Sequence, residues 1–123
     1  MTRPSPISRL AHRCAMFGCP ASLRESLAEQ TLRLASAAAV RLARAGELRW
    51  CDVDCVAVDA AAWCMGDGLR RYRRTRSAWS TYVSAAVRRE AARIQDDGRR
   101  MEAIRRRMCK GITEENENDF TID

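Results

Sequence analysis

Residues 77–94 of the chain read SAWSTYVSAAVRREAARI, and this stretch decides the fold class. Its apolar residues recur every three or four positions, which is the spacing of one buried face of an α-helix. They are Trp79, Val83, Ala86, Val87 and Ile94. Ser77 or Ser80 can cap the start of this helix. The stretch therefore predicts an amphipathic helix whose apolar face needs other helices to cover it.

Two further helices are predicted before this stretch. Ser22 and Glu25 have the spacing of a capping box, and the apolar positions after them predict a helix from about Leu23 to Ala45, with Gly46 placed to end it. Asp52 can cap the next helix, which Gly66 and Gly68 close. The expected inward residues of this second helix are Val56, Ala60, Trp63 and Cys64.

The remaining segments complete an all-α prediction, because no stretch alternates apolar and polar residues long enough for a strand. A break is expected at residues 96–98, followed by a short helical piece to about Lys110. Prolines and Gly18 break up the N-terminus, so residues 1–21 are predicted to be a disordered basic arm. Residues 111–123 carry five acids and no base, which predicts a disordered acidic tail. Residues 22–110 are thus expected to form one small bundle of three to four helices.

Charge is segregated along the chain. The chain has 22 basic residues, of which only Lys110 is not an arginine, against 16 acids. Between Leu69 and Lys110 there are 14 basic residues and four acids. A positive field of this density attracts polyanions, and guanidinium groups bond two phosphate oxygens at once. The alternatives are a solvated helix face and a GC-rich genome that encodes arginine regardless of function.

Aromatic rings lie inside the basic stretch and could stack on unpaired bases. Trp79 is expected to be partly buried, which leaves Tyr82 as the ring expected to be exposed. The candidate nucleic-acid contacts are Tyr72, Arg73, Arg74, Arg76, Trp79, Thr81, Tyr82, Arg88, Arg89 and Arg93.

The order of these residues resembles region two of bacterial RNA polymerase sigma factors. The matching pieces are DVDCVAVDAAAW at residues 52–63, LRRY at 69–72 and SAWSTYVSAAVRR at 77–89. In that family an acid-flanked helix of the type D-x-E-D-L-x-Q-E precedes an aromatic residue, a short loop and F-S-T-Y-L-x-x-x-V-R-N. The resemblance covers about a third of the chain.

The resemblance implies a role for three groups of residues. It places Asp54, Val56 and Asp59 on the helix that docks on the largest subunit of the polymerase. Positions 79, 81 and 82 correspond to the segment that melts promoter DNA and captures flipped bases, and positions 88 and 89 meet the upstream edge of the melted element. Val58 and Cys55 depart from the family's glutamine and acid. Nothing after Lys110 is expected to form the family's C-terminal helix-turn-helix domain.

The expected function is a non-enzymatic, sigma-like transcription module that binds promoter or single-stranded DNA together with the RNA polymerase core. The alternative is a helical adaptor with a basic face, or a protein that associates with itself. No nucleophile elbow, phosphate loop or paired carboxylates suggest catalysis, and no cofactor is expected.

Other features of the sequence carry weaker expectations. His12 with Cys14, Cys19, Cys51 and Cys55 could supply zinc ligands, but their spacings are not those of a zinc knuckle, so most cysteines are expected to be reduced and buried. No stretch approaches the roughly 18 apolar residues of a membrane span, so no membrane partner is expected. The expected location is cytoplasmic, with a mitochondrial location as the alternative because residues 1–24 are basic and lack acids.

Overall fold

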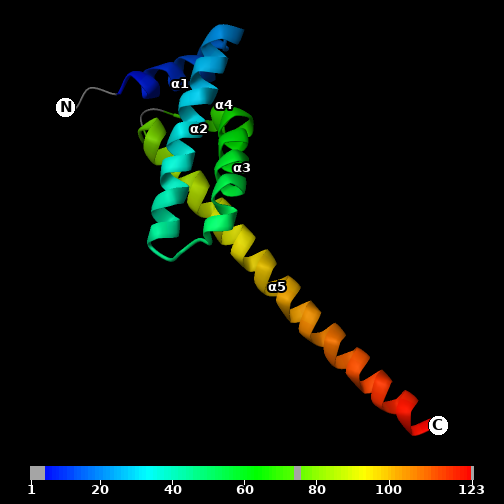
Figure 1. The fold of residues 1–123 in the computed structure, drawn as a ribbon. Helices are drawn as coiled ribbons and strands as arrows, with labels where there is room; N and C mark the ends of the chain where they lie inside the picture. Colours follow the sequence, from blue (N-terminus) through cyan, green and yellow to red (C-terminus); the bar gives the residue numbers. More distant parts are fainter. Residues whose placement is uncertain (1–4, 74–75, 123) are drawn as a thin grey trace. The chain divides into compact units, whose positions relative to one another are not determined.

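The computed structural model describes residues 5–73 and 76–122, with side chains up to Lys110, and every element in these ranges is helical (Figure 1). The elements are α1 (Pro6–Phe17), α2 (Ala21–Arg44), the 3₁₀ turn η1 (Trp50–Asp52), α3 (Val53–Met65), α4 (Asp67–Arg71) and α5 (Trp79–Ile122). The chain divides into two compact units, residues 1–92 and 93–123. The predicted all-α class is confirmed.

Helix α2 packs against α3 in the first unit (Figure 1). Its end is a Schellman motif, in which the Glu47 amide donates to the Leu42 carbonyl and the Gly46 amide donates to the Ala43 carbonyl. Gly46 has a φ of 77°, a conformation that side chains with a Cβ rarely adopt. The predicted end of this helix is therefore confirmed. The predicted capping box is wrong, because α2 begins at Ala21 after Pro20 and Ser22 lies inside it.

Helix α1 corrects the expectation that residues 1–21 form a disordered arm. Pro6 occupies the first helical turn, where a proline costs little because its missing N–H would have no helical partner. The Ser5 hydroxyl caps the helix by accepting from the Ser8 amide at 3.3 Å. Ser8, Ala11 and Cys14 are buried on one side of α1, which contacts α2 and α4. Prolines therefore mark the start of this helix and do not prevent it, while residues 1–4 lie outside the described ranges.

The core of the first unit joins small residues of α2 to larger residues of α3 and α5. Alanines on the buried face of α2 let neighbouring helices approach closely. From α5, Val83 and Val87 are fully buried, as their spacing predicts, and Trp79 is fully buried where only partial burial was expected. From α3, Val56, Ala60 and Cys64 are buried, whereas Trp63 keeps part of its surface in solvent.

In the second unit, residues 93–122 are the later part of helix α5, which begins at Trp79 in the first unit. The break predicted at residues 96–98 is not there, because helical backbone runs through Gly98. Residues 95–110 are all exposed. Residues 111–122 of the predicted acidic tail are the last part of α5, where only the backbone is described, and Asp123 lies outside the described residues. No helix in the described ranges combines the length and the apolar character needed to cross a membrane.

Candidate nucleic-acid interface

Four rings form an aromatic cluster (Trp63, Tyr72, Trp79 and Tyr82) inside the first unit. Centroid distances between neighbouring rings run from 4.8 Å for the edge-on pair Tyr72–Trp79 to 5.8 Å for Trp63–Tyr82. Tyr72 and Trp79 are fully buried, and Tyr82 is half-buried. Such tilted and edge-on contacts are the favourable arrangements for aromatic side chains in a core.

Hydrogen bonds fix three of these rings to the backbone and to α2. The Tyr82 hydroxyl donates to the Gly68 carbonyl at 2.7 Å, and the Tyr72 hydroxyl donates to the Ser77 carbonyl at 3.0 Å. The Trp79 indole N–H donates to Thr31 Oγ1 at 2.9 Å. Burial raises the pKa of the Tyr82 hydroxyl. The expected stacking platform is therefore replaced by a structural cluster, and Tyr82 is not the exposed ring that the sequence predicts.

Arg88 and Arg89 point to different neighbours. Adjacent residues of an α-helix are turned by about 100° from each other. The Arg89 guanidinium carbon lies 4.2 Å from the centroid of the Trp63 ring, over its face, which is a cation–π contact with α3. Arg88 instead lines an open groove toward α2. Of the predicted pair, Arg88 lines the groove, whereas Arg89 covers the Trp63 ring.

The α2–α5 groove has a volume of about 600 Å³. Leu34, Ala37 and Arg41 form the α2 wall at helical spacing. The α5 wall consists of Ser80, Thr81, Ser84, Ala85 and Arg88. None of the described residues that line the groove is acidic. It therefore combines two guanidinium groups with three hydroxyls and small apolar side chains.

The two arginines of the groove lie at about the same level. Helix α2 and the first turns of α5 run in the same direction (Figure 1). The Trp79–Thr31 hydrogen bond gives a common reference point, because Arg41 follows Thr31 by ten residues and Arg88 follows Trp79 by nine. At 1.5 Å per residue these offsets are about 15 Å and about 14 Å. Arg41 and Arg88 therefore lie toward the same end of the groove.

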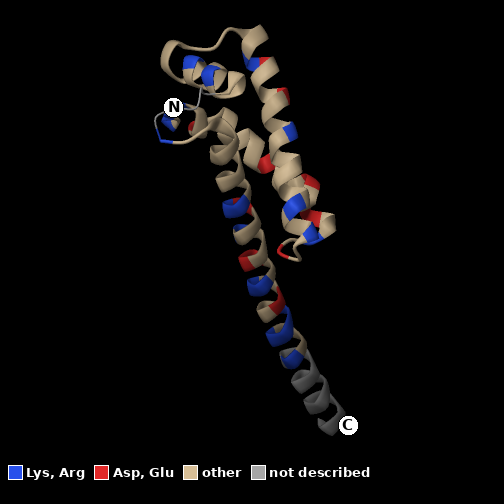
Figure 2. Cartoon of the chain, turned by 90° about the vertical axis from the view of Figure 1, so that its left-hand side faces the viewer, with Lys and Arg blue, Asp and Glu red and all other residues tan. Residues whose placement is uncertain are grey.

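The other predicted nucleic-acid contacts are dispersed. Arg73 and Arg76 are exposed near the start of α5, and the Arg73 guanidinium donates to the carbonyls of Arg70 and Tyr72. Arg74 lies outside the described residues. Arg93 belongs to the second unit, where it is 3.4 Å from Asp97. Figure 2 shows basic residues along several helices, so the charge does not lie on α5 alone.

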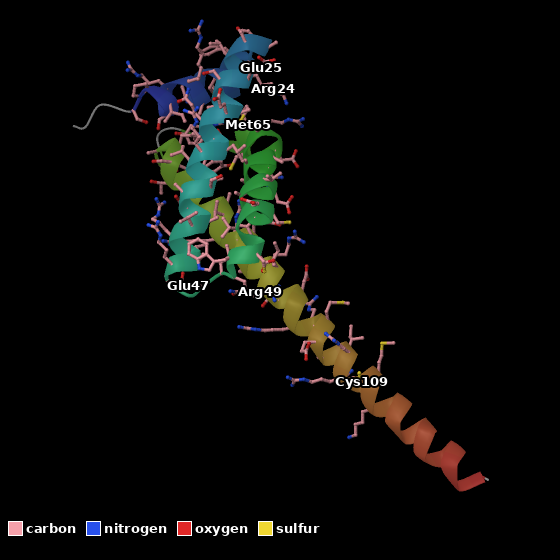
Figure 3. All side chains as sticks on the ribbon, viewed as in Figure 1. Arg24, Glu25, Glu47, Arg49, Met65 and Cys109 are labelled. Carbon is pink, nitrogen blue, oxygen red and sulfur yellow. The ribbon has the colours of Figure 1, made fainter. Side chains whose placement is uncertain are left out.

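The residues expected to dock on a polymerase differ in their exposure to solvent. Asp54 and Asp59 are exposed on α3, whereas Val56 is fully buried and contributes to the core. Figure 3 shows the surrounding landmarks, with Arg49 before α3 and Met65 at its end. Two of the three expected docking residues are thus exposed, and Val56 is not.

The cysteines do not form a metal site in the described part of the chain. No group of three or more metal-ligating side chains comes together there, so the candidates His12, Cys14, Cys19 and Cys51 with Cys55 are not assembled. Cys51, Cys55 and Cys109 are exposed, and Cys14 and Cys64 are buried. Burial raises the pKa of Cys64 to about 11, and burial with the neighbouring Cys19 raises the pKa of Cys14 to about 12. The expectation that most of the cysteines are buried is therefore wrong.

Sequence reasoning missed Arg41 as a site residue. Leu34, Ala37 and Arg41 share one face of the predicted helix, and that spacing is the signal that could have identified this wall. That spacing does not predict which helix packs beside this face of α2.

Comparison with known proteins gives no relative. No protein-family model matches the chain, and no curated protein or solved structure matches it.

Proposed function

We propose that this chain is a non-enzymatic helical module that binds the phosphate backbone of DNA in the α2–α5 groove. The observation that carries the proposal is the placement of Arg41 and Arg88 at one end of a groove lined by hydroxyls and by no acid among its described residues. Guanidinium groups and hydroxyls are the side chains that most often position a nucleic-acid backbone.

The proposed binding uses contacts with the DNA backbone and no stacking on bases. The rings that could have stacked on bases are held in the aromatic cluster, and three of them are fixed by hydrogen bonds. Phosphate contacts carry little sequence information and release condensed counterions. Binding is therefore expected to depend strongly on salt and weakly on sequence.

The test compares two neighbouring arginines. Arg88→Ala should lower the affinity for a labelled single-stranded DNA several-fold and reduce the slope of log affinity against log salt by about one phosphate contact. Arg89→Ala removes the same charge from the same helix but faces Trp63, so it should change DNA affinity less and lower stability instead. Fluorescence anisotropy over a salt series measures the DNA affinity of each variant and its salt dependence, and denaturant unfolding measures stability. Equal losses from the two variants, or none from Arg88→Ala, would contradict the proposal.

The proposal includes the RNA polymerase core as a partner, supported by the resemblance to sigma region two and by the exposed acids of α3. Reversing Asp54 and Asp59 to lysine should abolish retention of the chain by immobilised polymerase core, because the two lysines would repel a basic counterpart that the two aspartates attract. Reversing Glu25 and Glu29, two exposed acids on α2, makes the same change of charge and is the matched control, which should leave retention unchanged. Wild-type chain that is not retained would remove the polymerase from the proposal.

A further inference from the structure

The second unit carries an apolar seam (Ile94, Met101, Ile104 and Met108) along α5. The intervals of seven, three and four residues repeat the a, a, d, a positions of a coiled-coil heptad. Met101, Ile104 and Met108 are 65%, 49% and 62% exposed. Figure 3 shows the side chains along this part of α5, where Cys109 is labelled. Large apolar side chains repeated on one face are typical of a surface that another molecule covers.

The width of the seam favours a helix as that molecule. At 100° per residue the four side chains occupy an arc of about 80°, which is a coiled-coil seam and not the broader stripe of a helix that lies on a membrane. Asp97 occupies the remaining d position of this stretch and pairs with Arg93 at 3.4 Å. A polar residue at a core position lowers the stability of a coiled coil but selects its register.

The residues beside the seam determine which helix fits. In heptad numbering Arg93, Arg100 and Arg107 occupy g positions, and Arg105 occupies an e position. Charges at e and g positions face the partner helix and set its identity. A second copy in parallel register would bring Arg100 of one chain against Arg105 of the other, and an antiparallel copy would also bring arginine against arginine. Self-pairing over these residues is therefore disfavoured by repulsion between arginines, on both sides of the seam in a parallel pair and on the g side in an antiparallel pair.

We propose that residues 93–110 form a coiled-coil docking site for an acidic helix of another protein. That helix would present apolar residues at a and d and glutamate or aspartate at the flanking positions, so that it buries the seam and pairs with the four arginines. The acids of residues 114–119 do not meet this need within one chain, because they continue the same helix α5 and lie beyond its basic part. This inference uses a different unit from the α2–α5 groove and does not depend on the proposed function.

The experiment uses the full chain and two synthetic helices with isoleucine at a and leucine at d. One peptide carries glutamate at every e and g position, and the other carries lysine there. Isothermal titration calorimetry should detect binding of the glutamate peptide and at least about tenfold weaker binding of the lysine peptide. Ile104→Asp should abolish binding, because it places a charge in the apolar seam.

Two charge-reversal variants distinguish contacts made by the arginines beside the seam from non-specific electrostatic attraction. Replacing Arg100, Arg105 and Arg107 by glutamate should switch the preference to the lysine peptide. The matched control replaces Arg99, Arg106 and Lys110 by glutamate, which makes the same change of charge on the opposite face of the helix, and should retain the preference for the glutamate peptide. Equal binding of both peptides, binding of neither, or a switch in the control variant would overturn the inference. Self-association of the wild-type chain that Ile104→Asp abolishes would overturn it as well.

Discussion

Gly68 is the position where the aromatic cluster leaves no room for a side chain. A Cβ there would lie 2.7 Å from Cζ3 of Trp63 and 2.9 Å from the Trp63 carbonyl oxygen. Gly68→Ala should therefore lower the free energy of unfolding by about 1–3 kcal/mol, because the ring or the backbone must shift. Denaturant unfolding followed by tryptophan fluorescence measures the change.

Gly98 is the matched control for that substitution. It is also a helical glycine, but no atom lies within 4 Å of its Cβ position. Gly98→Ala should leave the unfolding of the first unit unchanged and raise helical content, since alanine is favoured over glycine in a helix by about 1 kcal/mol. A destabilisation as large as that of Gly68→Ala would show that packing against Trp63 is not the cause.

The candidate site also shows, residue by residue, what sequence can and cannot predict. The basic stretch and its rings were identified from composition and spacing alone. Arg88 and Arg89 are equivalent in sequence, and only the positions of α2 and α3 separate a groove residue from one that covers Trp63. Tyr82 was expected in solvent because no pattern on α5 indicates that the Gly68 carbonyl lies within hydrogen-bond distance.

Among the elements, α1 supplies a side-chain hydrogen-bond acceptor to the first residue of α5. The Ser8 hydroxyl accepts from the Trp79 amide at 2.9 Å, which satisfies one of the amides that every helix start leaves without a helical partner. Ser8→Ala should lower the free energy of unfolding by about 1–2 kcal/mol, because Ser8 is buried and the Trp79 amide would lose its acceptor.

Ser22→Ala provides the comparison for the Ser8 variant. Ser22 was predicted to cap α2, but it is exposed and the helix start has no side-chain cap. The substitution should change the free energy of unfolding by less than about 0.5 kcal/mol. A loss equal to that of Ser8→Ala would restore the predicted capping box and argue against the α1–α5 contact.

Element boundaries were predictable where local chemistry decides them. Gly46 ends α2, Gly66 follows α3, and the apolar spacing of residues 79–87 places their buried face correctly. Helix α1 was missed because its prolines and Gly18 were read as helix breakers, whereas Ser5 and Pro6 are a helix start signal. The buried contacts of Ser8, Ala11 and Cys14 that also stabilise it could not be read from local sequence. The continuity of α5 through residues 96–98 was missed because Asp-Asp-Gly is typical of a turn and not of a helix interior.

For the whole molecule, the raised pKa values of two buried cysteines predict that the folded state is less stable under alkaline conditions. The pKa of Cys64 is raised from 9.0 to about 11, and that of Cys14 from 9.0 to about 12. Raised values mean that the folded state favours the neutral thiol, whereas the unfolded chain releases its protons near pH 9. The stabilisation is therefore complete below pH 9 and is lost as the pH rises through about 11 for Cys64 and about 12 for Cys14.

This dependence can be measured and assigned to one residue. The free energy of unfolding should fall between pH 9 and 11, with Cys64 contributing about 2–3 kcal/mol at most. Cys64→Ala should show a smaller fall over the same interval in denaturant titrations. A variant whose pH dependence equals that of the wild type would exclude the Cys64 thiol as a cause.

Trp79 has a consequence for the order in which the molecule can assemble. Its two N–H groups bond to side chains 71 and 48 positions earlier, on α1 and α2. Helices α2 and α3 lie close together in sequence and can pair as soon as both are synthesised. The hydroxyls of Ser8 and Thr31, by contrast, cannot form these hydrogen bonds until Trp79 has been translated. A nascent chain that ends before Trp79 therefore cannot complete the hydrophobic core.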